Sequence, residues 1–327
     1  MNMEASKTWF ARARERLDQA PAQRQITFLY TGLALGLSAL VTLIVYGLDF
    51  SIAQSSGLSD MGNRALLSTL QTTLPLGLNL VLLCLELGFV AAMLRISRGQ
   101  YVSSQTLRLG FDRFWVLLRS TLLKGLLYLV VCLPVAYLSL ALYMLTPWSD
   151  SLIDAIMALV SESAGSSAAV FSDAAYDQLL SATDAFTAFS GVFMGIACLI
   201  LSYRYRMVNY ILIDKPGTGA LAAMRQSRAM MKGNCNALFK LDLRLWWYYA
   251  LAALALAAGN LDRLFPHLFP TETVGYWVSY GLNLLILAGS YCLLRSRVEV
   301  TYCFAYDALK PKEPQNQGVV LGNIFQM

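Results

Sequence analysis

The sequence predicts an all-α integral membrane protein, a bundle of six transmembrane helices with both termini in the cytoplasm and with amphipathic helices at the cytoplasmic interface. Three observations predict this class. Hydrophobic residues make up 57% of the 327 residues and charged residues only 14%, whereas soluble domains carry about 25% charged residues. The charges avoid long apolar stretches. Almost all Lys and Arg residues fall on one side when these stretches are threaded through a bilayer.

Six apolar stretches reach or approach the ~20 residues that a helix needs to cross a hydrocarbon core of ~30 Å. They lack the 3.6-residue amphipathic stripe that surface helices of a soluble protein show. Glu86, in the second stretch, is the one charged residue that they contain. The predicted spans are 26–48, 75–94, 125–145, 185–203, 245–261 and 274–294.

The positive-inside rule orients these spans. Of the 25 Lys and Arg residues, all except Arg64 and Arg263 lie in the N-terminal segment, the second and fourth connections or the tail. Residues 1–25 are therefore expected to form a basic cytoplasmic segment. The first span is too long for a cleaved signal peptide and predicts a retained signal-anchor. Residues 26–309 form the predicted membrane domain and residues 310–327 a cytoplasmic tail.

The third connection, residues 146–184, is predicted to be an external acidic insertion. It contains six Asp and Glu residues and neither Lys nor Arg. Two short amphipathic helices are expected at 150–160 and 173–183, the second with Ser172 as its N-cap. The insertion either packs on itself as a solvated cap or docks a cationic partner or substrate.

Two cytoplasmic connections predict amphipathic helices. Residues 219–231 alternate Leu, Met and Ala with Arg225 and Arg228 at roughly helical spacing, and Lys232 follows. Such a helix should lie at the level of the inner headgroups, with its cations facing anionic lipid. Residues 107–118, which combine arginines with aromatic residues, predict a counterpart.

Glu86 is the strongest single candidate for a functional residue. If the second span starts at Pro75, a favoured first helical position, Glu86 lies near the bilayer centre. An ionisable group there costs roughly 2.5–3.5 kcal/mol on insertion scales and needs a partner. Residues 65–85 are also uncharged, so a shifted span would place Glu86 near the inner interface. Three interpretations remain: a structural pair with Arg204 or Arg206, an interfacial position, or a role linked to a proton or substrate.

Arginines gather at the inner ends of the fourth and sixth spans. They either snorkel toward the interface or form an inward-facing basic pocket for an anionic headgroup or substrate, because the guanidinium fork suits phosphate. Together with the cations after residue 224, they make up the predicted lipid- or anion-binding set. This set is Arg204, Arg206, Arg225, Arg228, Lys232, Arg295 and Arg297.

The sequence contains no recognisable catalytic motif. It has no phosphate-binding loop, no Gly-x-Ser-x-Gly and no His-Glu-x-x-His, and its one histidine, His267, is poorly placed for acid–base work. The six cysteines lack zinc-ligand spacing. We therefore expect a protein that is not an enzyme, without cofactor, metal or nucleic-acid partner.

Two functional hypotheses follow from these residues. In the first, a non-enzymatic membrane protein assists another membrane complex or interacts with anionic lipid through its basic cytoplasmic face. The alternative is a secondary transporter or channel for a small solute, with Glu86 and the inner arginines lining the path. Membrane lipids and a membrane-protein partner are the expected partners. The ligand, the partner and the oligomeric state do not follow from the sequence.

Five segments of the chain resemble a bacterial membrane-protein family catalogued as domain of unknown function 975. They are YRYRMVNYILIDKP (203–216), AMRQS (223–227), MKGN (231–234), LFKLD (238–242) and VTYCFAY (300–306). The family is similar, more distantly, to the membrane portion of some glycerophosphodiester phosphodiesterases. The resemblance implies a multi-pass protein of the bacterial plasma membrane and implies no activity. The long acidic third connection departs from the short turn expected for this family.

Overall fold

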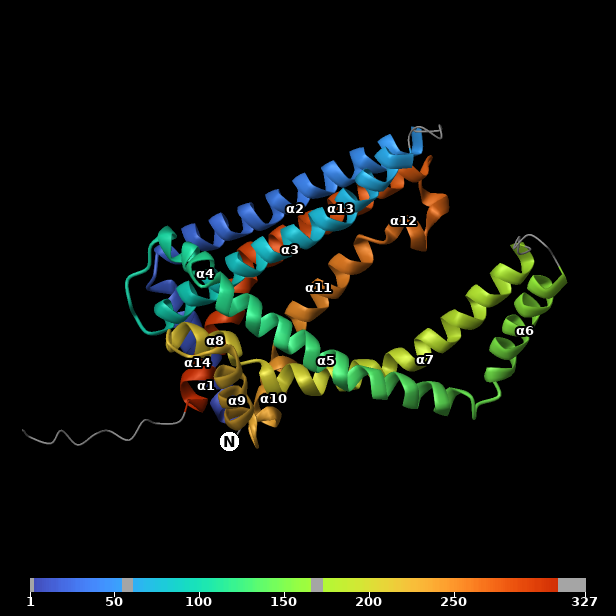
Figure 1. The fold of residues 1–327 in the computed structure, drawn as a ribbon. Coiled ribbons are helices and arrows are strands. Elements are labelled where there is room, and N and C mark those ends of the chain that lie inside the picture. The colour runs from blue at the N-terminus through green and yellow to red at the C-terminus, as the bar shows by residue number, and fades with distance from the viewer. Residues whose placement is uncertain (1–2, 55–60, 166–172, 311–327) are drawn as a thin grey trace, which may run out of the picture. The chain divides into compact units, whose positions relative to one another are not determined.

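The computed structural model describes residues 3–54, 61–165 and 173–310. Helices make up 88% of the structure, and no described residue lies in a strand, which confirms the all-α class (Figure 1). The larger helices are α1 (Met3–Asp18), α2 (Ala22–Gln54), α3 (Met61–Ser97), α5 (Phe114–Tyr143), α6 (Ser149–Gly165), α7 (Asp173–Tyr205), α9 (Ala220–Met231), α10 (Cys235–Arg244), α11 (Trp246–Ala258), α13 (Glu272–Ser290) and α14 (Ser296–Leu309). The short elements are η2 (Ser104–Arg108), α4 (Leu109–Asp112), α8 (Val208–Asp214), α12 (Leu261–Leu264), η3 (Pro266–Leu268) and the π-helical turn η4 (Tyr291–Arg295).

Five helical segments among the described residues are long and apolar enough to cross a membrane. This agrees with a multi-pass membrane protein and includes five of the six predicted spans. The segments are Ala22–Leu48, Ala65–Ser97, Phe114–Tyr143, Leu179–Asp214 and Thr273–Leu309. The second begins earlier than predicted, because Pro75 lies inside α3 and not in its first turn.

The sixth predicted span, 245–261, corresponds to a shorter helix. Helix α11 has 13 residues, which at 1.5 Å per residue reach about 20 Å, less than a hydrocarbon core. Its end is tied to α13, because Asn283 Nδ2 donates to the carbonyl oxygen of Ala255 at 2.9 Å. A Cβ at Gly259 would lie 2.5 Å from the same Nδ2. The number six therefore stays a prediction.

The chain divides into two compact units, and the first comprises Met1–Arg119 and Met207–Met327. Within it α2, α3 and α13 run side by side, and α11 packs against α13. Helices α1, α8, α9, α10 and α14 gather at one end of this unit, and α12 lies at the other end (Figure 1). The segments of this unit that lie outside its long apolar helices are therefore found at its two opposite ends.

The core of the first unit lies around the second half of α3. Leu87 and Phe89 are fully buried, and the η2–α4 segment packs on this half of the helix. A Cβ at Gly88 would lie 2.1 Å from the carbonyl oxygen of Leu107, and one at Gly110 would lie 1.8 Å from that of Cys84. Only glycine permits this approach. The continuous amphipathic helix predicted over 107–118 is instead divided among η2, α4 and the start of α5.

The basic N-terminal segment forms a helix that the sequence did not predict. In α1, Trp9, Ala13 and Leu17 recur every four residues and are all buried, so they form one apolar stripe. Helix α1 packs against α14 and α10. The arginines on its other faces are exposed. Part of the predicted cytoplasmic segment is thus docked on the protein.

The second unit, Ser120–Arg206, consists of most of α5 together with α6 and α7. Its core is built on Tyr143, whose ring meets Phe186 edge-on at 5.3 Å between centroids. Helix α6 confirms the helix predicted at 150–160. The helix predicted at 173–183 is instead the first part of α7, which continues to Tyr205. Its predicted cap, Ser172, lies outside the described residues.

Candidate functional site

Glu86 forms an ion pair with Arg295. Arg295 Nη2 donates to Glu86 Oε1 at 3.1 Å, which joins α3 to the π-helical turn η4. The partner that the structure assigns to Glu86 is therefore Arg295, which the sequence did not suggest among its three interpretations. The Arg295 side chain is 14% exposed and that of Glu86 is 47% exposed. The carboxylate of Glu86 is therefore the solvent-accessible member of the pair, and the guanidinium of Arg295 is the more enclosed one.

Three aromatic rings surround the Arg295 guanidinium. Its central carbon lies 4.6 Å from the ring centroid of Tyr291, 5.2 Å from that of Tyr30 and 5.9 Å from that of Phe89. Cation–π attraction at such distances offsets part of the lost hydration of the cation. Arg295 Nε is nevertheless buried without a hydrogen-bond partner among the described residues. We call Tyr30, Glu86, Phe89, Tyr291 and Arg295 the arginine box.

The π-helical turn helps to build this box, because a π-turn shifts the register of side chains between α13 and α14. Such turns recur at functional sites. We can identify no signal in the sequence that predicts the π-helical turn at Tyr291–Arg295. Arg297, two residues after Arg295, is exposed, so the structure separates two arginines that the sequence placed in one predicted set.

A polar stripe continues from Arg295 along α14. The side chains of Arg295, Glu299, Tyr302, Tyr306 and Lys310 follow at intervals of three or four residues and share one face of the helix. The bonds from this stripe are Tyr210 Oη to Glu299 Oε1 at 2.5 Å, Tyr302 Oη to Asp242, Tyr306 Oη to Asp214 Oδ2 at 3.1 Å and Lys310 Nζ to Asp214 Oδ2 at 2.7 Å. The stripe ties α8 and α10 to α14.

The far end of this stripe is a four-charge cluster. Arg98, just after α3, donates from Nη1 to Asp214 Oδ1 at 2.7 Å and from Nη2 to Asp307 Oδ1 at 2.6 Å. Lys310 completes the cluster through Asp214. Hydrogen bonds to Asp307, and then to Asp214, raise the pKa of Arg98 further above its usual high value. Two cations and two carboxylates thus hold α3, α8 and α14 together.

Helix α9 and the residue that follows it carry the three cations predicted to face lipid. Arg225, Arg228 and Lys232 are exposed, as expected. The opposite face of α9, which includes Met224 and Met230, is buried and packs on the protein. The apolar face therefore packs on protein and not on lipid tails, and the position of α9 at the level of the headgroups stays a prediction.

The remaining predicted arginines belong to the second unit. Arg204 is exposed, and Arg206 is half-buried with its guanidinium carbon 5.7 Å from the ring centroid of Tyr203. The pair predicted between one of them and Glu86, which belongs to the first unit, stays a prediction. The predicted set of seven cations therefore divides into the half-buried Arg295, the exposed cations of the first unit and these two arginines.

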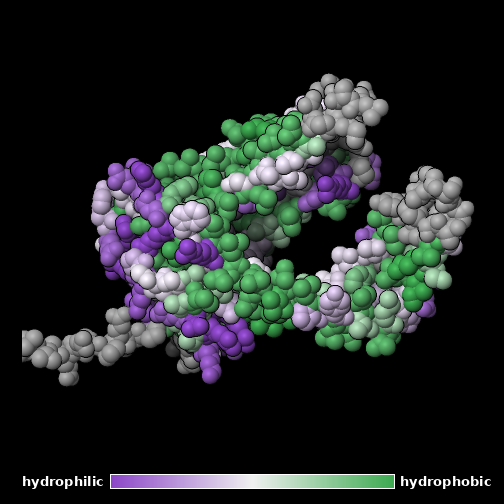
Figure 2. All heavy atoms as spheres, viewed as in Figure 1, coloured by the Kyte–Doolittle hydropathy of each residue, from purple (hydrophilic) through white to green (hydrophobic). Residues whose placement is uncertain are grey.

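Hydrophilic surface gathers at the end of the first unit that carries α4, α8 and α9, whereas apolar surface covers α2 and α3 (Figure 2). A smaller hydrophilic patch lies beside α12, which carries Arg263. We call the first of these two regions the basic end. It includes the exposed arginines of α1 and the exposed cations of α9.

Comparison with known proteins identifies a family and no activity. No curated protein and no solved structure matches the chain. A family model described as "Protein of unknown function (DUF975)" matches residues 22–310, which include every candidate span and the arginine box. The chain therefore belongs to this family of unknown function.

Proposed function

We propose that the protein is a non-enzymatic, multi-pass protein of the bacterial plasma membrane that binds anionic lipid through its basic end and thereby assists a membrane complex. The basic end would face the cytoplasm, as would both chain termini. The observation that carries the proposal is the fixed presentation of cations on α9. The distant similarity to glycerophosphodiester phosphodiesterases stays a prediction and carries no part of this argument.

Helix α9 supports the proposal because its buried methionine face holds its cations in place. Arg225 and Arg228 project from a helix whose other side is anchored in the protein. Less side-chain and helix motion has to be lost when a rigid cationic surface meets anionic headgroups. Each such cation near an anionic surface contributes about 1 kcal/mol.

An exposed apolar stripe on α10 and α11 adds a second contact with the bilayer. Phe239, Leu243 and Trp246 are 45%, 57% and 66% exposed and recur at intervals of four and three residues. Lys240, beside them, is also exposed. Aromatic and aliphatic side chains beside a cation are typical of a surface that enters the headgroup region.

The test compares lipid selectivity in reconstituted vesicles. The triple variant Arg225→Gln, Arg228→Gln and Lys232→Gln should lower the preference for spin-labelled phosphatidylglycerol over phosphatidylcholine by about 100-fold, since ~3 kcal/mol of attraction is removed. A matched triple variant that exchanges Arg and Lys at the same positions should keep the preference. Equal preference in the parent and the Gln variant would remove the proposal.

Transport is the second candidate function, and the arginine box supports it. An ion pair in an apolar helical segment is costly and often functional, and here Arg295 Nε has no hydrogen-bond partner in the described part of the chain. If this site moves protons, Glu86→Gln should abolish proton flux into vesicles that contain a pH-sensitive dye, while the variant still folds and is retained in the vesicles in the same amount as the parent. A parent protein without flux above that of empty vesicles would end this candidate.

A further inference from the structure

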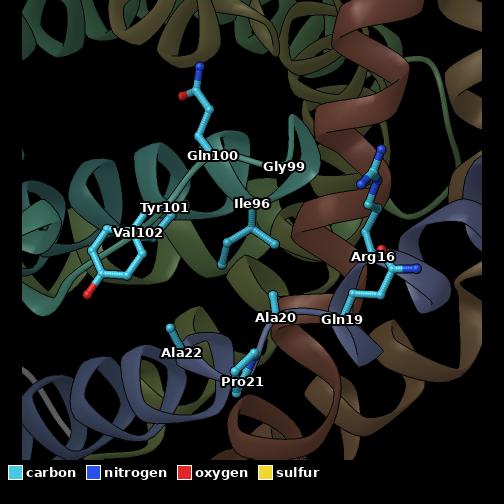
Figure 3. Close-up of a pocket in the computed structure, with 10 residues that line it drawn as sticks. All are labelled: Arg16, Gln19, Ala20, Pro21, Ala22, Ile96, Gly99, Gln100, Tyr101 and Val102. Atoms are coloured by element: carbon cyan, nitrogen blue, oxygen red, sulfur yellow. The ribbon is translucent and has the colours of Figure 1, made fainter.

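A cavity of about 430 Å³ opens where the turn between α1 and α2 meets the end of α3 (Figure 3). Its volume lies in the range of small-ligand sites. Arg16 and Gln19 lie on the α1 side, Tyr101 and Val102 lie on the facing side, and Ile96 points between them. The sequence did not predict this cavity, because residues distant in the chain form its two walls.

Both walls are held by the fold. Helix α1 is fixed by its buried stripe of Trp9, Ala13 and Leu17. Helix α3 ends in a Schellman motif, in which the N–H of Gln100 donates to Arg95 O at 2.9 Å and that of Gly99 to Ile96 O at 2.9 Å. Gly99 has a φ of +71°, which this motif requires and glycine adopts without strain. The cavity is therefore preformed.

The lining combines one cation with neutral polar groups and an apolar floor. Arg16 supplies the charge, and its Nη1 lies 3.5 Å from the position of a Cβ built on Gly99. Gln19 adds an amide, and Tyr101, 89% exposed, adds a phenol at the rim. The floor includes the buried side chains of Ile96 and Val102. No residue that lines the cavity is acidic, so the lining suits an anion joined to a less polar body.

The cavity also lies at a membrane boundary by the order of the chain. One candidate span begins at Ala22 and another ends at Ser97. Ala22 and Ile96 both line the cavity. A site that lies at the polar ends of two spans lies at the level of the lipid headgroups. Further exposed arginines on α1, such as Arg12, repel the ammonium group of a zwitterionic headgroup.

The geometry points to a binding site for the phosphodiester of one anionic phospholipid, with Arg16 as its main ligand. This inference rests on the proposed interaction with anionic lipid and gives it a defined site. The guanidinium of Arg16 binds the phosphate, Gln19 and Tyr101 bind polar groups of the head, and the apolar floor receives the first carbons beyond it.

Native mass spectrometry of the full-length protein in detergent tests the site. The parent should retain one molecule of phosphatidylglycerol and about 10-fold less phosphatidylcholine. Arg16→Gln should lower the retained phosphatidylglycerol about 10-fold, and Arg16→Lys should restore part of it. Arg263→Gln, which removes an exposed arginine of α12 at the opposite end of the first unit, should leave retention unchanged and is the matched control.

A second variant fills the cavity without changing its charge. Ala22→Phe should prevent retention while the melting temperature in lipid-free detergent stays near that of the parent. Retention by Ala22→Phe or by Arg16→Gln at the parent level would overturn the site. Displacement of the lipid by millimolar inorganic phosphate would overturn the assignment to a lipid and indicate a site for free phosphate.

The two proposals fail in different ways. If the parent retains no lipid at this site but still prefers phosphatidylglycerol in vesicles, only the cavity assignment is wrong. If the parent shows no preference in vesicles, the proposed function itself is wrong.

Discussion

Helices α3 and α5 are nearly equal in hydropathy and differ in what surrounds them. In the most apolar window of α3, half of the residues are buried inside the protein, against 6% in α5. Phe89 on α3 is fully buried, whereas Leu126 and Leu129 on α5 are 60% and 55% exposed. Apolar composition shows that a segment avoids water. It does not show whether protein or lipid takes the place of water.

The two helices also differ in how closely the backbone of a neighbouring segment approaches them. The backbones of α3 and the η2–α4 segment meet at Gly88 of α3 and at Gly110 of α4, whereas no described atom lies within 4 Å of a Cβ built at Gly125 on α5 or at Gly191 on α7. Glycines at similar density in the sequence therefore have different roles. In the core of the first unit they permit a contact, and along α5 and α7 they leave open space.

The largest expected contrast is between two truncations. Phe89→Ala should lower the free energy of unfolding in mixed micelles by about 3–5 kcal/mol, because it removes a fully buried ring and leaves a cavity. Leu126→Ala should cost less than about 1 kcal/mol, since its side chain is exposed. A similar cost for both would mean that a partner or a second copy covers α5.

A smaller contrast should separate two glycines. Gly110→Ala should cost about 2–3 kcal/mol of unfolding free energy, because the new methyl group meets the carbonyl oxygen of Cys84 and the backbone must shift. Gly191→Ala should be neutral or slightly stabilising, because alanine favours a helix. The same mixed-micelle titration measures both, and a neutral Gly110→Ala would show that η2–α4 does not press on α3.

The smallest contrast concerns two neighbouring arginines. Arg295→Gln should cost about 2 kcal/mol, because it removes the cation from three aromatic rings and leaves Glu86 without its partner. Arg297→Gln should stay within about 0.5 kcal/mol, since Arg297 is exposed. Thermal melting in detergent compares the two variants, and equal melting temperatures would argue against a stabilising role for the arginine box.

The elements that the sequence predicted well are those with a strong local signal. Five apolar helices are present where spans were predicted, and α6 lies where the acidic insertion predicted a helix. The span at 245–261 was predicted by composition alone, and in the structure it is a shorter helix whose end at Gly259 packs against Asn283 of α13. That contact joins residues 24 positions apart and has no local signature.

The candidate site was predicted only in part. Glu86 and Arg295 were both singled out, but as members of different sets, and Arg98, Asp214 and Asp307 were not selected at all. Their four-charge cluster with Lys310 depends on the meeting of α3, α8 and α14. The apolar stripe of α1 was visible in the sequence as Trp9, Ala13 and Leu17. Its periodicity could have identified the helix.

The sequence by itself determined that this chain is helical, that long stretches of it avoid water and that its cations are segregated from those stretches, because composition and charge order are local properties. Only the tertiary structure decided which apolar face meets protein, which carboxylate pairs with Arg295 and where a cavity forms beside Arg16. Those outcomes depend on distances between segments far apart in the chain. The hydrophobic effect sets no such distances, since it has no direction and rewards any burial of apolar surface.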